Sequence, residues 1–280
     1  MTNNEKMTLI NFLSPGSDKT QTHPTLGCFY LNMEVDDGTR EQYIEYISKA
    51  IRETYVDANY LSTVMEREGF DGVAKLFKER FENNKDFGVR TGDFGEIVGH
   101  TVLMDILGYS IPIYKIRYKT NWNKAAFGVD IIAFRLDEND PSKDTVVFGE
   151  AKASTQKDYG VEKVFEEIQQ LVEDGQSEAQ QKMRNAVRFV SERLYDLKEF
   201  DLEKRIYRFL DSYTNPHYIE TFYPFLIREK KTWTKDVLEK IVLNKLEPER
   251  ITLCVFVVEN LDDVIQDAYK RAANIEVKVG

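Results

Sequence analysis

The stretch that decides the fold runs from Ala125 to Ala153 and reads AAFGVDIIAF, then RLDENDPSKD, then TVVFGEAKA. Its first and last segments are apolar, have the length of strands and are rich in Val, Ile and Phe, and a polar loop separates them. The pattern predicts an antiparallel pair of strands. Because each strand also carries charged residues in an otherwise apolar segment, the pair is the candidate site as well as the centre of the fold.

The two-residue period of a strand decides where those charges point. On the second strand, Glu150 and Lys152 share a face with Val146 and Phe148, and residues of the opposite face are apolar too. On the first strand, Asp130 likewise continues an apolar row. An ionised carboxylate in such a place is costly unless a cation or hydrogen bonds hold it. Two neighbouring carboxylates raise each other's pKa, and a divalent metal removes that conflict.

Length and composition describe an ordinary globular protein. The 280 residues are 42% hydrophobic and 31% charged, which allows a large core without disulfides or a structural metal. Cys28 and Cys254 lie in apolar runs and are expected to be reduced core thiols. The chain shows no signal-peptide pattern and no apolar stretch of about eighteen residues, so we expect a cytoplasmic protein without a membrane segment.

The formal charge of -10 argues against a protein that coats nucleic acid unaided. A local basic strip departs from this average, because Asp and Glu are absent between Ile106 and Val129. The strip contains four cations that alternate with aromatic residues: Lys115, Arg117, Lys119 and Lys124. We expect a strand over 111–119 with three of these cations on one face, either as a phosphate track or as a solvated outer face.

Other elements are predicted from the spacing of apolar residues. Before the strand pair we expect a loosely tied arm (1–25), a strand (26–35) and helices over 40–55, 69–81 and 91–107. After it we expect a helix (161–172), a mainly helical charged segment (177–246), a buried strand (251–258), a closing helix (261–273) and a last strand (275–279). This divides the chain into an N-terminal accessory region (1–88), a core (89–175), a helical insertion (176–248) and a C-terminal strand and helix that complete the core (249–280).

Glu96 lies at the head of an apolar stripe on the predicted helix over 91–107. Two interpretations of this residue stand side by side. Asp93 and Glu96 have the spacing of a capping box, in which Glu96 would only satisfy the start of the helix. Alternatively, Glu96 joins Asp130 and Glu150 as a third acid of the site.

The order of elements, with Asp130 on one strand and Glu150 and Lys152 on the next, resembles the core of the PD-(D/E)xK nucleases. The wider motifs, GDFGE ending at Glu96, FGVD ending at Asp130 and FGEAK ending at Lys152, are similar to those of the HamA family, the nuclease effectors of the Hachiman antiphage defence system. The proline that usually precedes the first catalytic acid is replaced by Val129. The resemblance implies a restriction-endonuclease-like α/β fold, a mixed sheet flanked by helices with an N-terminal α/β extension and a helical insertion.

The resemblance also implies an activity and its residues. Catalytic roles would fall to Asp130, Glu150, Lys152 and Glu96 of a Mg²⁺-dependent deoxyribonuclease. The metal, Mg²⁺ or alternatively Mn²⁺, would be held by Asp130, Glu150, Glu96 and the main-chain carbonyl of Ala151, since hard oxygen ligands suit these ions. Lys152 would orient the attacking water and offset charge that develops on the phosphate.

The partners implied by the resemblance are DNA and the superfamily-two helicase HamB. The chain has no GxxxxGK[ST] phosphate-binding loop of its own, so a motor would have to come from such a partner. Two other interpretations remain open. The chain could be a catalytically weak nuclease-fold module that docks on a helicase and regulates it, or Glu150 and Lys152 could be a structural ion pair at the end of a strand.

Overall fold

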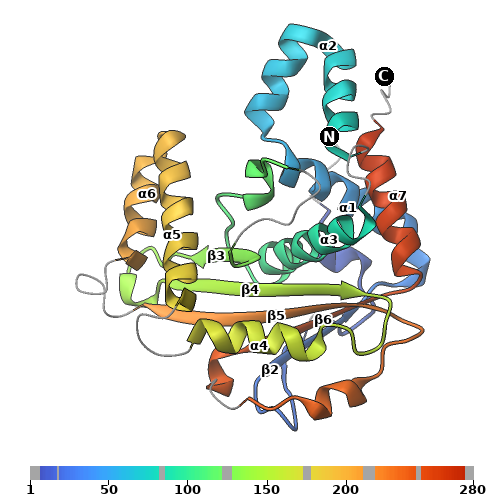
Figure 1. Cartoon of the computed structure of the whole chain (residues 1–280), viewed down its shortest axis with the longest axis vertical. Coiled ribbons are helices and arrows are strands. Elements are labelled where there is room, and N and C mark those ends of the chain that lie inside the picture. Colours follow the sequence, from blue (N-terminus) through green and yellow to red (C-terminus); the bar gives the residue numbers. More distant parts are fainter. Residues whose placement is uncertain are drawn as a thin grey trace.

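The computed structural model describes residues 7–17, 19–81, 86–121, 128–172, 178–210, 218–243 and 247–274. These residues form a mixed six-stranded sheet with helices on both faces (Figure 1). The strands are β1 (Gln21–Thr22), β2 (Phe29–Glu34), β3 (Ile131–Arg135), β4 (Thr145–Ser154), β5 (Ile219–Glu229) and β6 (Thr252–Val258). Their order across the sheet is β1-β2-β6-β5-β4-β3. The predicted α/β class, with a mixed sheet between helices, is confirmed.

The predicted strand pair is present as β3 and β4, which run antiparallel with Ile131 opposite Gly149. From β4 inward the pairing becomes parallel, first to β5, then to β6 and β2. Because β3 runs against β4, the start of β3 lies beside the C-terminal half of β4. Asp130 directly precedes β3, so this topology places it next to Glu150.

Helices cover both faces of the sheet, as the two apolar faces of β4 predict. One face packs against α1 (Arg40–Tyr55), α3 (Phe87–Thr101) and α7 (Leu261–Ala273), and the other against α4 (Val161–Val172) (Figure 1). Val147 and Ala151 belong to the first of these cores, whereas Val146 and Phe148 belong to the second. Burial on both sides explains the nearly continuous apolar sequence of β4 and β6.

Three further helices extend from this body: α2 (Ala58–Phe81), α5 (Glu178–Asp196) and α6 (Phe200–Tyr207). A break at Gly69, where φ is +65°, interrupts α2, and only its second half was predicted. Helices α5 and α6 form a hairpin that stands off the sheet (Figure 1). None of the described helices combines the length and apolar character needed to cross a membrane.

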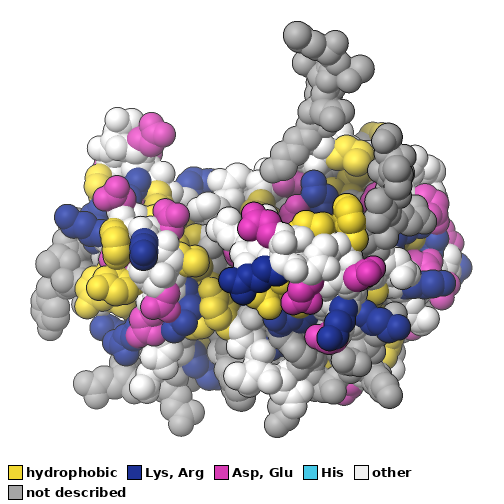
Figure 2. All heavy atoms as spheres, turned by 90° about the horizontal axis from the view of Figure 1, so that it is seen from above, with side chains coloured by type: hydrophobic (Ala, Val, Ile, Leu, Met, Phe, Trp, Pro, Cys, Tyr) yellow, Lys and Arg dark blue, Asp and Glu magenta, His cyan; other side chains and the backbone are white. Residues whose placement is uncertain are grey.

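Apolar side chains gather on the α5–α6 hairpin (Figure 2). Four of them are between 49% and 62% exposed: Tyr195, Leu197, Phe200 and Tyr207. The remaining short helices are Leu9–Phe12, Asp37–Thr39, Val102–Ile106, Lys115–Tyr118, Pro141–Lys143, Arg208–Leu210, Lys235–Lys240 and Pro248–Arg250.

The prediction of a loosely tied N-terminal arm is wrong for its described part. Leu9 and Phe12 are buried in the core. The amide of Leu9 donates a hydrogen bond of 2.8 Å to the carboxylate of Asp105, which fixes the start of the arm to the segment after α3. Main-chain hydrogen bonds also tie the arm to the end of β2, such as that of 2.8 Å from the Ser14 amide to the Glu34 carbonyl. Burial and these bonds together hold the described part of the arm in place.

The segment 176–248 is not purely helical, because β5 lies within it as an inner strand of the sheet. The sequence did not predict this strand, because it contains Pro224 in its middle and Arg228 and Glu229 at its end. Proline and buried charges are rare in inner strands. The region before residue 89 also contributes a strand, β2, to the same sheet. The four-region division stays a prediction, and the expected strand over 275–279 lies outside the described residues.

Candidate functional site

The structure brings Asp130, Glu150 and Lys152 together at the end of β4. The Lys152 Nζ atom lies 3.8 Å from Asp130 Oδ2 and 3.9 Å from Glu150 Oε2. The amide of Ala151 donates a hydrogen bond of 3.1 Å to Asp130 Oδ2. The three predicted side chains therefore form one compact group, held partly by the main chain of β4.

A fourth residue of this group, Glu167, was missed by the sequence analysis. It lies on α4, and its Oε2 atom is 2.6 Å from Lys152 Nζ, the shortest contact of that ammonium with a carboxylate in the group. In the sequence, only its position next to Ile168, at the border of the apolar stripe of this helix, could have pointed to Glu167 as a site residue. That signal does not separate Glu167 from an ordinary surface acid.

The electrostatics of the group follow from burial and from crowding of acids. Burial raises the pKa of Glu150 well above its usual 4.5, and the charge of Asp130 adds to this. Burial acts in the opposite direction on Lys152, but the carboxylates of Asp130, Glu167 and Glu150 outweigh it, so the pKa of Lys152 is raised above 10.5. Lys152 therefore stays charged at neutral pH, while Glu150 is easier to protonate than an exposed glutamate.

Glu96 is buried in the middle of α3, on the opposite face of the sheet from α4, and lies within electrostatic reach of Asp130. Its carboxylate atom Oε2 has no hydrogen-bond partner among the described residues. Burial, and then the charge of Asp130, raise the pKa of Glu96 well above 4.5. The capping-box interpretation is wrong, because α3 begins at Phe87 and is capped by Asp86, whose side chain accepts hydrogen bonds from the first amides.

Asp93, the expected capping residue, instead forms a buried ion pair with Lys119. The Lys119 ammonium lies 2.6 Å from Asp93 Oδ2, and both side chains are 2% exposed. Tyr55 donates a further hydrogen bond to the same carboxylate atom. Lys119 therefore does not present its charge to solvent in this structure.

The basic strip is not a strand, so that prediction is wrong. Residues Lys115–Tyr118 form a short 3-10 helix, and their side chains diverge. Lys115 turns inward and donates to the carbonyl of Val129, whereas Arg117 pairs with Asp57 at 3.0 Å. Alternation of cations and aromatic residues is also typical of a strand, but the three described cations of the strip each contact a different acceptor. Lys124 lies outside the described residues, and contact of the strip with nucleic acid stays a prediction.

The donor set suits a hard divalent cation, although no group of three or more His, Cys, Asp or Glu side chains in the described part of the chain is arranged to hold one. Asp130 and Glu150 already face each other, and Mg²⁺ commonly uses one or two carboxylates with waters. In a strand the amide and carbonyl of one residue face the same neighbour, so the Ala151 carbonyl points to the side of Asp130. The unpartnered oxygen of Glu96 is a further hard donor.

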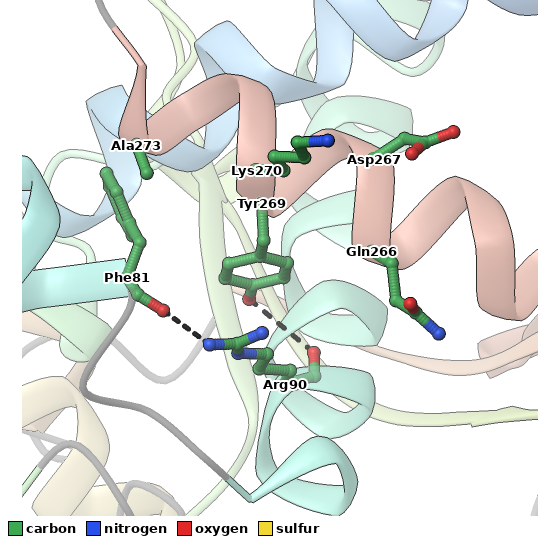
Figure 3. A pocket seen from close by; sticks show the side chains of 7 residues that line it. All are labelled: Phe81, Arg90, Gln266, Asp267, Tyr269, Lys270 and Ala273. Carbon is green, nitrogen blue, oxygen red and sulfur yellow. Dashed lines mark hydrogen bonds between the residues drawn. The ribbon is translucent and has the colours of Figure 1, made fainter.

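A pocket of about 340 Å³ lies between α7, α3 and the end of α2 (Figure 3). It is lined by Phe81, Arg90, Gln266, Asp267, Tyr269, Lys270 and Ala273. The hydroxyl of Tyr269 is 3.3 Å from that of Tyr55, which connects the pocket wall to Asp93. The pocket lining does not include Asp130 or Glu150, so the pocket is not the candidate site.

Comparison with known proteins adds a family to this geometry. The family model described as HamA matches residues 7–272, which include every candidate residue of the site and all six strands of the sheet. A comparison with curated proteins gave no match.

Proposed function

Because this chain belongs to the HamA family of Hachiman defence-associated proteins, we propose that it is a metal-dependent DNA nuclease and the effector of that antiphage system. The observation that carries the proposal is the convergence of Asp130, Glu150 and Lys152 at the end of β4. A mixed sheet flanked by helices is consistent with a nuclease-like core.

Each residue of the site has a role in phosphodiester hydrolysis. Asp130, Glu150, Glu96 and the Ala151 carbonyl would hold Mg²⁺, or alternatively Mn²⁺, which supplies Lewis-acid polarisation of the phosphate when bound. A bound cation would offset the repulsion between the Asp130 and Glu150 carboxylates and would favour the charged form of Glu150. Lys152 remains charged and so is suited to offset the negative charge that develops on the phosphate.

Plasmid nicking in Mg²⁺ tests this activity. Purified wild type is compared with Glu150→Ala and Lys152→Ala, each alone and with the superfamily-two helicase HamB. We expect both variants to lose cleavage on the order of 100-fold or more. The matched control is Glu138→Ala, which removes an exposed acid from the loop between β3 and β4, at the end of this strand pair opposite the cluster, and should cleave like wild type. Equal cleavage by all the proteins would remove the nuclease assignment.

A second candidate function is a nuclease-fold module that docks on the helicase and regulates it with little cleavage of its own. The exposed apolar side chains of the α5–α6 hairpin favour it, because a contiguous apolar patch often marks a protein interface (Figure 2). The test is co-elution of the helicase with wild type and with Leu197→Ser/Phe200→Ser. Helicase binding that depends on these residues, without plasmid cleavage under any condition, would favour the module over the nuclease.

A further inference from the structure

We infer that Glu167 is a positioning residue that holds the Lys152 ammonium away from Asp130 and Glu150, and thereby leaves those two carboxylates open to a divalent cation. The inference rests on the proposed function, because it concerns the same site. It assigns to α4 a part in the chemistry that neither the strand motifs nor the helix with Glu96 provide.

The distances around Lys152 show which carboxylate holds it. A single ammonium faces three acids, but only Glu167, at 2.6 Å, lies within hydrogen-bonding distance. Asp130 and Glu150 are 3.8 Å and 3.9 Å away, beyond that distance. The attraction between charges falls with distance, so Glu167 is the stronger anchor, and it is not one of the proposed metal ligands.

The start of α4 is built against Lys152, which keeps Glu167 in reach. Gly160 precedes the helix with φ of +71°, and a Cβ added there would lie 3.2 Å from the Cβ and Cγ atoms of Lys152. The turn before it is held by Arg228, which is 1% exposed and donates a hydrogen bond of 2.9 Å to the carbonyl of Tyr159. The helix that carries Glu167 therefore begins at a fixed point beside the Lys152 side chain.

Loss of the Glu167 charge would change the partner of Lys152. Without its closest acid, the ammonium is left with Asp130 and Glu150, and a small rotation of the lysine side chain would bring it into hydrogen bonds with them. A divalent cation would then have to displace the ammonium before it could bind. We expect Glu167→Gln to weaken binding of the cation on the order of tenfold.

Direct titration of the whole protein with Mn²⁺, without DNA, measures this effect. Glu167→Gln is compared with Glu166→Gln, which removes an equal charge from the neighbouring, exposed position of the same helix. We expect the dissociation constant to rise about tenfold in Glu167→Gln and less than about twofold in Glu166→Gln. Glu167→Asp, which keeps the charge on a shorter side chain, should fall between wild type and Glu167→Gln. Equal dissociation constants for the two glutamine variants would overturn the inference.

A Lys152→Met background separates action through lysine from direct contact with the cation. In that background Glu167→Gln should weaken Mn²⁺ binding no more than Glu166→Gln does, because no ammonium remains to be held. A tenfold loss that persists would overturn the inference, since Glu167 would then act on the cation itself. A wild type that binds Mn²⁺ and cleaves DNA, but matches Glu167→Gln in affinity, would overturn this inference alone. A wild type that neither binds Mn²⁺ nor cleaves DNA would overturn the proposed function with it.

Discussion

Two lysine–carboxylate groups lie on either side of β3 and β4, and they differ in the ratio of lysines to acids and in exposure to solvent. Lys119 and Asp93 pair one to one, with both side chains 2% exposed. Lys152 faces three acids, and the exposed fractions of its own side chain and of Asp130 are 18% and 21%. A buried balanced pair is satisfied by the protein alone. A partly open group with surplus negative charge is suited to take up a further cation, which is why only the second group is a candidate site.

The largest effect is expected when the buried Lys119–Asp93 ion pair is broken. Lys119→Met would leave the buried charge of Asp93 without its partner, so we expect the free energy of unfolding to fall by about 3–5 kcal/mol. Equilibrium unfolding in urea measures it. The control is Lys163→Met, whose side chain is 67% exposed and which should stay within about 0.5 kcal/mol of wild type. A loss of less than about 1 kcal/mol in Lys119→Met would contradict the distinction drawn between the two groups.

The equivalent change in the unbalanced group should have the opposite pattern. We expect Lys152→Met to reduce Mg²⁺-dependent DNA cleavage on the order of 100-fold, while its free energy of unfolding stays within about 1 kcal/mol of wild type. The group is partly open to solvent, and the raised pKa of Glu150 lets this carboxyl take up a proton, so an isolated buried charge is avoided. Cleavage rates and urea unfolding, measured on the same preparation, check the loss of activity and the unchanged free energy of unfolding. A severe loss of stability would mean that Lys152, like Lys119, is a structural residue.

A smaller effect is expected from pH. The raised pKa of Glu150 means that the folded protein binds more protons than the unfolded chain above pH 4.5, so this residue costs stability as pH rises through that window. Glu150→Gln removes the cost and should stabilise the protein by about 1–2 kcal/mol at neutral pH. The gain should disappear below pH 4.5, where Glu150 is protonated in both states. Urea unfolding at several pH values measures the difference, and a variant less stable than wild type at pH 7 would contradict the expected sign.

The smallest effect concerns stabilisation by the cation. Mg²⁺ at about ten times its dissociation constant should stabilise the wild type by about 1.4 kcal/mol, which corresponds to a few degrees in the unfolding midpoint. Glu150→Gln should show little of this shift, because it lacks one of the ligands. An equal shift in both proteins, measured by thermal unfolding, would mean that the cation binds elsewhere.

Periodicity predicted the parts of the fold that depend on neighbours in sequence. Helices α1 and α7 begin and end where apolar spacing places them, and the faces of β3 and β4 follow from the two-residue period. The placement of Asp130 beside Glu150 follows from the same period, since an antiparallel partner brings them together. Alternation also misled, because cations and aromatic residues alternate over 111–119 without forming a strand.

Pairing across the fold could not be predicted in the same way. The ion pairs Lys119–Asp93 and Lys152–Glu167 join separate elements of the fold. No periodic pattern in the sequence predicts such contacts. Strand β5 was missed because Pro224 and the buried Arg228 contradict the usual composition of an inner strand. The structure accommodates the buried Arg228, since one of its terminal nitrogens donates a hydrogen bond to the carbonyl of Tyr159.

The position of β6 in the sheet has a consequence for how a cell makes this protein. β6 fills the space between β2 and β5, yet it is the last of the six strands to be synthesised. Ribosomes add roughly 5–20 residues per second, so β2 emerges well before its parallel neighbour β6 exists. A nascent chain released before residue 252 would lack the strand that joins both halves of the sheet. The sheet is thus completed only near the end of translation, and a truncated chain keeps β2 apart from the other strands that β6 would join to it.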